Sequence, residues 1–250
     1  MPAGPRVGQV GIAENLAEVR RRVDEACVAA GRDPSQVRLL PVSKTKPPSA
    51  IREAYDAGVR LFGENKVQEA VAKAEVFADV PDLRWAVIGH LQTNKARQVA
   101  AVADEFHALD SLRVAEALNR RLHMLDRTLD VFVQVNSSGE ESKFGLAPED
   151  VPGFARELEQ FQTLRVRGLM TLAVFSDDAA LVGACFARMR ELQARLQDSH
   201  DHPEWWRELS MGMSGDYELA ISYGATTVRV GQAIFGNRLD PNDYWPVSAR

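Results

Sequence analysis

Apolar residues near the start of the chain recur at helical spacing. Residues 8–30 place six apolar or small side chains at steps of three and four: Ile12, Leu16, Val19, Val23, Cys27 and Ala30. This spacing predicts an amphipathic helix. Gly31 is placed to end it, with Pro34 just beyond. We expect the helix to pack on the outside or at one end of the body, because it precedes the first predicted strand.

Eight short apolar segments follow, and a helical pattern lies between each one and the next. The predicted strands span 37–43, 59–64, 84–89, 105–109, 129–135, 164–170, 207–211 and 226–230. Three residues are predicted helix N-caps: Thr93, Ser111 and Ser214. The helix after Ser111 is expected to bury Leu112, Ala115, Leu118 and Leu122. A later helix is expected to start at Pro148 and Glu149, and another to bury Leu181, Cys185, Met189, Leu192 and Leu196.

Regular alternation of strands and helices predicts parallel crossovers. Eight such units predict an α/β fold of the (β/α)8, TIM-type barrel kind. A doubly wound open sheet is the alternative, which the lack of a Gly-rich dinucleotide turn disfavours. We predict one domain over 1–250, with an extra N-terminal helix at 8–31 and the barrel at 37–250.

Composition narrows the function classes. The chain has 250 residues, 45% of them hydrophobic, which is enough for one sizeable core. Its formal charge, 30 − 35 = −5, comes without a basic block, so we expect neither a nucleic-acid nor a membrane partner. The start of the chain lacks a signal-peptide core, and no apolar run could span a bilayer. Cys27 and Cys185 are expected to be core thiols, and the cytoplasm is the expected location.

The first predicted strand ends in a lysine. Residues 39–43 are mostly apolar, Lys44 follows directly, and Pro47 and Pro48 come just after it. Low dielectric disfavours the charged form of an amine, and a neutral lysine is a nucleophile that can form a Schiff base. The alternative is a solvated lysine in a strand–helix loop. Lys46, Lys66 and Lys95 do not follow an apolar strand directly and are expected to be solvated or to face anions.

Two glycine-bearing turns follow the last two predicted strands. Residues 210–216 place small residues before a helix, where backbone N–H groups suit a phosphate and Ser214 can add its hydroxyl. Residues 231–236 let the backbone approach a ligand closely. Barrels commonly bind phosphate at these two loops. The alternative is one helix cap and one tight turn. Asp216 is expected to serve the first helical turn and to point away from a phosphate.

An amine facing a phosphate site is what pyridoxal phosphate needs. Arg229, two residues before Gly231, would then face the pyridine ring and leave its nitrogen unprotonated, which weakens the cofactor as an electron sink. Other side chains have weaker patterns. His90 ends the third strand and could contact a ligand or order its loop, whereas the metal-like pair His200 and His202 looks like part of a solvated loop.

At this point the sequence resembles the pyridoxal-phosphate homeostasis protein family, also called proline-synthetase co-transcribed or alanine-racemase N-terminal-domain-like. The matching segments are spread over nearly the whole chain in the family's order: 42–47, 62–69, 88–95, 143–146, 167–171, 209–216, 228–231 and 234–236. Two segments depart from the family's pattern. The family usually has a small hydroxyl residue where this chain has Gln232, and often has His-Phe where it has Ala86-Val87.

The resemblance implies an alanine-racemase-like barrel that carries pyridoxal 5′-phosphate (PLP) as an internal aldimine on Lys44. It implies further cofactor-binding residues: Ser214, Gly231 and Gln232 at the phosphate, Arg229 by the pyridine nitrogen, and Asn65 and Met211 along the pocket. For Gln232 the expected contact is the backbone N–H. No residue is assigned as catalytic and none as a metal ligand.

The family lacks the second, C-terminal domain of alanine racemase, and this chain ends at Arg250 without room for one. The resemblance therefore implies a protein that carries and buffers PLP without established turnover, and the leading hypothesis adds apo-enzymes as candidate recipients of PLP. A single-domain PLP-dependent amino-acid racemase is the alternative; it needs two opposed acid–base groups, and only Lys44 is evident. A barrel enzyme that binds a phosphate ligand without any cofactor is the third hypothesis.

Overall fold

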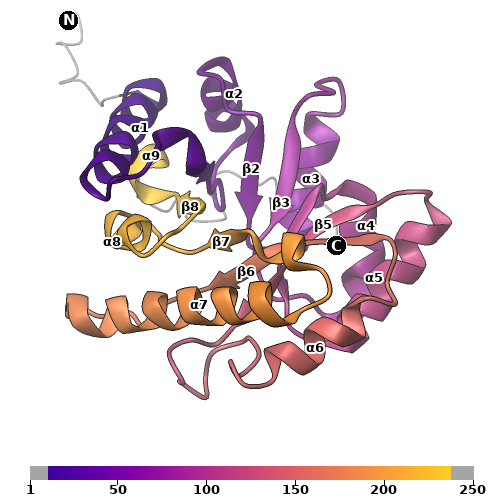
Figure 1. Ribbon diagram of the computed structural model, residues 1–250. Helices are drawn as coiled ribbons and strands as arrows, with labels where there is room; N and C mark the ends of the chain where they lie inside the picture. The colour runs from indigo at the N-terminus through magenta and orange to yellow at the C-terminus, as the bar shows by residue number, and fades with distance from the viewer. Residues whose placement is uncertain (1–10, 238–250) are drawn as a thin grey trace, which may run out of the picture.

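A curled parallel sheet forms the centre of the molecule, and helices cover its outside (Figure 1). The computed structural model describes residues 11–237. Within these residues the sheet has eight strands: β1 (Arg38–Pro41), β2 (Leu61–Glu64), β3 (Arg84–Val87), β4 (Glu105–Leu109), β5 (Leu129–Val135), β6 (Leu164–Thr171), β7 (Glu208–Ser210) and β8 (Thr227–Val230).

Helices alternate with these strands. Their bounds are α1 (Ile12–Ala29), α2 (Pro48–Asp56), α3 (Val67–Val76), α4 (Ala96–Val102), α5 (Leu112–Met124), α6 (Val151–Leu158), α7 (Ala179–Ser199), α8 (Tyr217–Ser222) and α9 (Gln232–Phe235). Three 3-10 turns add η1 (Pro34–Gln36), η2 (Thr93–Lys95) and η3 (Pro203–Trp206). The helix after β8, poorly marked in the sequence, has only four residues.

The sheet closes on itself. Its strand order is β1-β8-β7-β6-β5-β4-β3-β2, and every neighbouring pair is parallel. The two ends meet where Val42, just past β1, bridges Gly63 on β2 and the Ser43 N–H donates to the Gly63 carbonyl at 3.0 Å. The predicted (β/α)8 barrel is confirmed.

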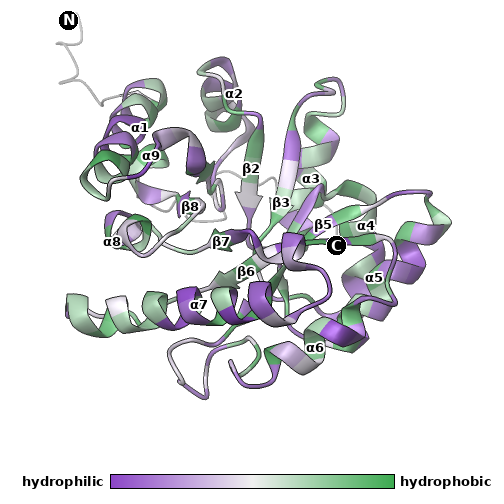
Figure 2. Cartoon of the chain, in the orientation of Figure 1, coloured by the Kyte–Doolittle hydropathy of each residue, from purple (hydrophilic) through white to green (hydrophobic). Residues whose placement is uncertain are grey.

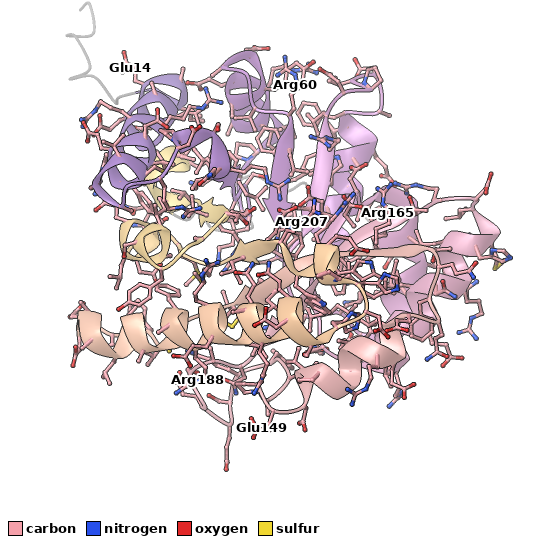
Figure 3. The ribbon with its side chains drawn as sticks, viewed as in Figure 1. Glu14, Arg60, Glu149, Arg165, Arg188 and Arg207 are labelled. Carbon is pink, nitrogen blue, oxygen red and sulfur yellow. The ribbon has the colours of Figure 1, made fainter. Side chains whose placement is uncertain are left out.

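Alternation along the strands divides the apolar residues between two sides of the barrel wall. Leu40, Leu61 and Ala86 form a small cluster of their own, which we place inside the barrel. Residues one position further along, such as Phe62 and Val87, belong to the large core between strands and helices. Figure 2 shows green segments on β2, β6 and β7, and helices with mixed green and purple faces. Charged side chains such as Glu14 and Arg60 project outward (Figure 3).

The N-terminal helix is the extra element of the barrel. α1 buries Leu16, Val19, Val23 and Cys27 and packs against α2, α8 and α9. Gly31 has φ +68°, a left-handed conformation suited to the end of a helix. The predicted stripe and stop are confirmed, while residues 8–10 of the predicted 8–31 segment and residues 238–250 of the predicted barrel lie outside the described residues.

Three details of the predicted helices are wrong. Thr93 begins the turn η2, and α4 starts three residues later behind Lys95, without a side-chain cap. Leu112 and Leu181 lie in the first turns of α5 and α7, and 38% and 55% of these residues are exposed because the buried stripes start at Val114 and Val182. The helix expected from Pro148 and Glu149 begins at Val151, since residues 148–150 form a turn.

Other details agree with the structure. β4 and β5 have the predicted bounds, and the Ser111 hydroxyl caps α5 by accepting from the Val114 N–H. Cys27 and Cys185 are buried free thiols. Within residues 11–237 no helix is long and apolar enough to cross a bilayer, and no three His, Cys, Asp or Glu side chains gather as a metal site. His200 packs beside Trp205 and Trp206, with its ring 5.5 Å from each of theirs.

Candidate functional site

Lys44 follows the end of β1, at the carboxyl end of the barrel strands. Val42 is the last residue before it that pairs with both neighbouring strands: it bridges Gly63, and its N–H donates to the Val230 carbonyl at 2.9 Å. Residues 44 and 45 then turn toward α2, and Lys44 is partly buried. The strand-end position predicted for this lysine is confirmed.

Lys46 takes a different position from the one predicted. It is buried rather than solvated, with 6% of the residue exposed. Its Nζ donates to the carbonyls of Phe235 at 2.7 Å and Gly236 at 3.2 Å, and also to that of Asn237. Burial lowers the pKa of this amine. Lys46 therefore ties the turn that carries Lys44 to the C-terminal end of α9.

The loops after β7 and β8 meet at one hydrogen bond. The Gly231 N–H donates to the Ser214 hydroxyl at 3.3 Å. The predicted N-cap role of Ser214 is wrong, because α8 begins at Tyr217 behind Asp216. Asp216 instead accepts from the Met213 N–H at 2.5 Å, so it braces this loop. The hydroxyl of Ser214 is thus directed to the glycine turn, and both groups are exposed or partly exposed.

Two glycines allow this close approach. Gly212 has φ +92°, and a Cβ there would lie 2.7 Å from the Ala220 Cβ. A Cβ on Gly231 would lie 3.0 Å from the Val42 carbonyl oxygen. The phosphate-type turn therefore packs directly on the residue two positions before Lys44. This places the candidate amine and the candidate anion site on adjoining strand ends.

Gln232 contributes its backbone rather than its side chain. The side-chain amide donates to Asn237 Oδ1 at 2.9 Å, which engages it within α9 and the residues that follow. Its N–H stands in the first turn of α9, where backbone N–H groups lack intrahelical partners. The site can thus offer an anion the Gly231 and Gln232 N–H groups together with the Ser214 hydroxyl.

Arg229 is a buried cation below these loops. Only 3% of the residue is exposed, and its guanidinium donates to Ser210 Oγ and to the Thr171 carbonyl, both at 2.7 Å. Burial lowers the pKa of Arg229 to about 10, opposed by the charge of Asp216. The guanidinium therefore remains protonated at neutral pH.

A polar chain continues from Arg229 through the barrel interior. Ser210 Oγ lies 2.9 Å from His107 Nδ1, and His107 Nε2 lies 2.8 Å from Glu105. The Glu105 carboxylate can only accept, so His107 donates from Nε2, and in the neutral ring Nδ1 then accepts from the Ser210 hydroxyl. Burial lowers the pKa of His107, which agrees with a neutral ring. Glu105 in turn pairs with Arg38 at 2.5 Å.

Sequence reasoning missed this chain of side chains. One signal was present: Glu105 and His107 are polar residues two apart in a predicted strand, and such residues share one face of a sheet. Polar groups on the inward face of a buried strand need partners inside the barrel. Their partners Arg38, Ser210 and Arg229 come from distant parts of the sequence, so pairing them required the fold.

The two remaining predicted site residues, Asn65 and Met211, differ in their exposure to solvent. Asn65 is exposed just past β2, and its backbone carbonyl would be 2.1 Å from a Cβ at Gly89, so the two strand ends approach too closely for a side chain at residue 89. Met211 is fully buried past β7, and its N–H donates to the Thr227 carbonyl at 3.1 Å. Their places beside a cofactor stay predictions.

The His90 side chain contacts two other loops at the rim of the barrel. Its ring stacks on Phe144 with centroids 3.9 Å apart, and its Nδ1 lies 3.4 Å from Asp110. Phe144 belongs to the loop after β5, and 57% of it is exposed. The loops after β3 and β5 therefore meet through this stack.

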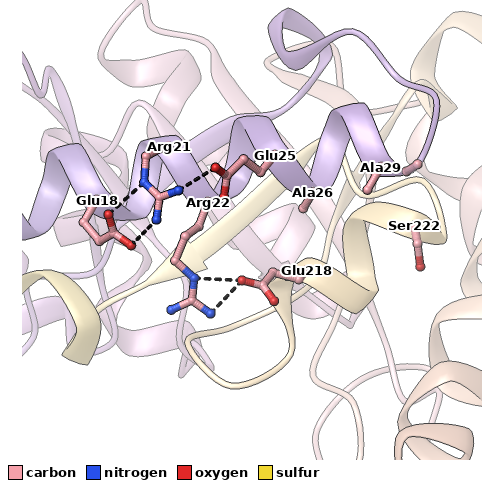
Figure 4. A pocket seen from close by; sticks show the side chains of 9 residues that line it. Glu18, Arg21, Arg22, Glu25, Ala26, Ala29, Glu218 and Ser222 are labelled. Carbon is pink, nitrogen blue, oxygen red and sulfur yellow. Dashed lines mark hydrogen bonds and ion pairs between the residues drawn. The ribbon is translucent and has the colours of Figure 1, made fainter.

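A hollow of about 570 Å³ lies elsewhere, between α1 and α8 (Figure 4). Its charged side chains are paired with one another. Arg21 bonds to Glu18 and Glu25, and Arg22 to Glu218. These pairs are exposed, so the charged side chains that line this hollow already have partners. The candidate chemistry therefore stays with the strand ends around Lys44.

Comparison with known proteins identifies the family of this chain. Residues 12–239 match the family described as alanine racemase, N-terminal domain. A relative from Pseudomonas aeruginosa, named pyridoxal phosphate homeostasis protein, is 48% identical over 227 residues, which cover 91% of this chain and 96% of the relative. The chain belongs to the pyridoxal phosphate homeostasis protein family, within the alanine racemase N-terminal domains.

Solved structures with similar folds include two that bear on this family. A structure of PipY from Synechococcus elongatus with PLP bound has 42% sequence identity and a TM-score of 0.79, covering 90% of this chain and 100% of that one. Alanine racemase from Streptomyces coelicolor has 20% identity and a TM-score of 0.71, covering 93% of this chain but 60% of that one. The second likeness shows a shared barrel alone.

The residues of this chain fit a phosphorylated aldehyde. Lys44 supplies an amine at the end of β1, and the Ser214–Gly231 contact supplies anion donors against the same strand. Arg229 adds a fixed positive charge below them. An amine for the aldehyde and an anion site for the phosphate are the groups that PLP needs, and Arg is one of the residue types found at its ring nitrogen.

Proposed function

We propose that this chain binds PLP reversibly and serves its homeostasis, without catalytic turnover of a substrate. The observation that carries the proposal is the packing of the Gly231 turn against Val42, two residues before Lys44. In this proposal the packing brings the phosphate donors Ser214 and Gly231 close to the strand that carries Lys44. The names of the relative from P. aeruginosa and of the PLP-bound PipY structure support the same ligand.

In this proposal Lys44 forms the covalent link. Its Nζ, as the neutral amine, would hold the aldehyde carbon of PLP, with the aldehyde oxygen released as water. Addition of water would return the cofactor intact. Lys46 stays out of this chemistry because three backbone carbonyls already accept from its Nζ.

The other predicted residues orient the cofactor. Ser214 and the N–H groups of Gly231 and Gln232 hold the phosphate, while Asn65 and Met211 line the pocket. Arg229 faces the ring nitrogen. A guanidinium does not yield its proton, so it keeps that nitrogen unprotonated and limits carbanion chemistry on the ring.

The proposed role is to keep reactive aldehyde low and to supply PLP to apo-enzymes, in the cytoplasm. Reversible linkage suits both tasks, because a carrier must hold the aldehyde and also let it go. We assign no catalytic residue, no metal, and neither a nucleic-acid nor a membrane partner.

Absorbance of the purified protein with PLP tests this proposal. We expect an absorbance band at about 420 nm that disappears on borohydride reduction. The reduction should leave a pyridoxyl mass on Lys44. Lys44→Ala is expected to show neither signal. The same band and mass in Lys44→Ala would assign the link to another lysine, and a colourless, unmodified wild type would favour a cofactor-free phosphate-binding enzyme.

A single-domain amino-acid racemase is the second candidate, because residues 12–239 match the alanine racemase N-terminal domain family. Incubation with L-alanine or L-serine in deuterium oxide separates the two. The carrier is expected to exchange the Cα proton far below enzyme-like rates. Exchange at rates typical of enzymes, about 1 s⁻¹ or more, would favour the racemase.

A further inference from the structure

A buried ion pair lies behind the turn that carries Lys44. Glu69 and Lys73 are one helical turn apart on α3, and Lys73 Nζ is 2.8 Å from Glu69 Oε1 and 2.7 Å from Glu64 Oε1. The side chains of Lys73 and Glu64 are fully buried. Taking such charges out of water costs several kcal/mol unless every group is paired and hydrogen-bonded. A buried pair of this kind is therefore poor evidence for a purely stabilising role.

The pair holds both peptide groups that flank Lys44. Lys73 Nζ donates to the Ser43 carbonyl at 2.7 Å, and the Thr45 N–H donates to Glu69 Oε1 at 2.6 Å. The first peptide ends at the Lys44 nitrogen, and the second begins at the Lys44 carbonyl carbon. Together they set the position and direction of the Lys44 Cα–Cβ bond.

The backbone beside Lys44 needs such support. Thr45 has φ +61°, the left-handed region, which is costly for a β-branched residue. Its hydroxyl is buried and has no hydrogen-bond partner among the described residues. Conformations of this kind persist only where the surroundings determine them, and they occur at functional sites. The contact from Glu69 to the Thr45 N–H is one such determinant.

Resting on the proposed function, we propose that Glu69 and Lys73 are positioning residues that aim the Lys44 amine at the aldehyde. They act through the two flanking peptides and touch no part of the phosphate site, which belongs to β7, β8 and α9. Glu69 and Lys73 thus form a clamp on the two peptides that flank Lys44. Loss of this clamp should reduce C=N bond formation while leaving phosphate recognition intact.

Two ligands separate these effects. PLP reports C=N bond formation through its absorbance near about 420 nm. The probe 4′-deoxypyridoxine 5′-phosphate keeps the phosphate and ring but lacks the aldehyde, so calorimetric titration measures non-covalent binding alone. For Glu69→Ala we expect the apparent affinity for PLP to fall about tenfold, the scale of one lost hydrogen bond to a charged group. Affinity for the deoxy probe is expected to stay within about twofold of wild type.

Three further variants complete the test. Glu69→Gln keeps an oxygen acceptor for the Thr45 N–H and is expected to restore most of the PLP affinity. Glu25→Ala breaks an exposed i, i+4 pair with Arg21 on α1 and is expected to leave both ligands unchanged. Should Glu69→Ala fail to fold, Lys73→Met combined with Glu64→Gln removes the ammonium together with one facing charge. We expect this double variant also to lose affinity for PLP while keeping its affinity for the deoxy probe.

Each result decides the proposal. Wild-type PLP affinity in Glu69→Ala overturns the positioning role, as does an equal loss of PLP and deoxy probe. A wild-type protein without the absorbance band instead overturns the proposed function. Loss of PLP affinity alone, restored by Glu69→Gln, supports the clamp.

Discussion

The Ser214 hydroxyl accepts a hydrogen bond from the Gly231 N–H at 3.3 Å, which joins two loops 17 residues apart into one edge of the site. A phosphate oxygen placed there would compete for the same N–H and receive the hydroxyl proton. The first prediction tests this contact.

Ser214→Ala should weaken PLP binding about tenfold, because one hydrogen bond to a charged phosphate is lost. Ser214 is exposed, so the free energy of unfolding should hardly change. Titration with pyridoxal, which lacks the phosphate, should give the same affinity in both proteins. Ser222→Ala, which removes an exposed hydroxyl from α8, is the matched control. Equal loss of pyridoxal and PLP affinity would contradict a phosphate contact.

Gly212→Ala should lower the free energy of unfolding by about 2 kcal/mol, since φ is +92° and the new Cβ would meet the Ala220 Cβ at 2.7 Å. Gly215→Ala is its control in the same loop, because a Cβ there meets nothing within 4 Å. Urea denaturation measures both. A Gly212→Ala protein as stable as wild type would show that the loop relaxes without strain.

Ser210→Ala should destabilise the protein by about 2 kcal/mol, because one guanidinium N–H of Arg229 and the Nδ1 of His107 would be buried without their shared partner. The same Ser222→Ala variant serves as control, measured by urea denaturation. If Ser210→Ala matches that control, the interior chain adds nothing to stability.

Acid stability should depend on Glu105. Burial raises the pKa of this carboxyl, but hydrogen bonds from His107 and Arg38 outweigh burial and lower the pKa from 4.5 to about 2. A depressed carboxyl pKa gives stability that is present above pH 4.5 and is lost as pH falls through 2. Glu105→Gln should therefore lose less stability over that interval, while being about 2 kcal/mol less stable at pH 7.

Denaturation curves at pH 7, 4.5 and 3 measure this difference. Glu208→Gln is a contrasting control, because burial raises the pKa of Glu208 and its effect on acid stability has the opposite sign. Parallel stability curves for wild type and Glu105→Gln below pH 4.5 would show that this carboxylate is not the group that titrates.

Much of the fold could be predicted because its elements are local patterns. β4 and β5 have their predicted bounds, since each is a short run between clear turn residues. Helix starts were less predictable: Ser214 has the chemistry of a cap, yet its hydroxyl meets Gly231 on another loop. Leu181 fits a helical stripe by spacing, but the neighbouring Val182 faces the core.

The candidate site divides in the same way. Lys44 and Gly231 could be predicted because each directly follows an apolar strand. The partners of His107 and Lys73 could not, because each pairing depends on which strands and helices become neighbours. The solvated environment predicted for Lys46 was wrong for that reason, since its three acceptors come from residues nearly two hundred positions away.

The bridge between Val42 and Gly63 joins the end of β1 to β2. The ring of strands is thus completed immediately beneath Lys44. Opening the barrel at this bridge would therefore displace the residue to which the proposed function assigns PLP.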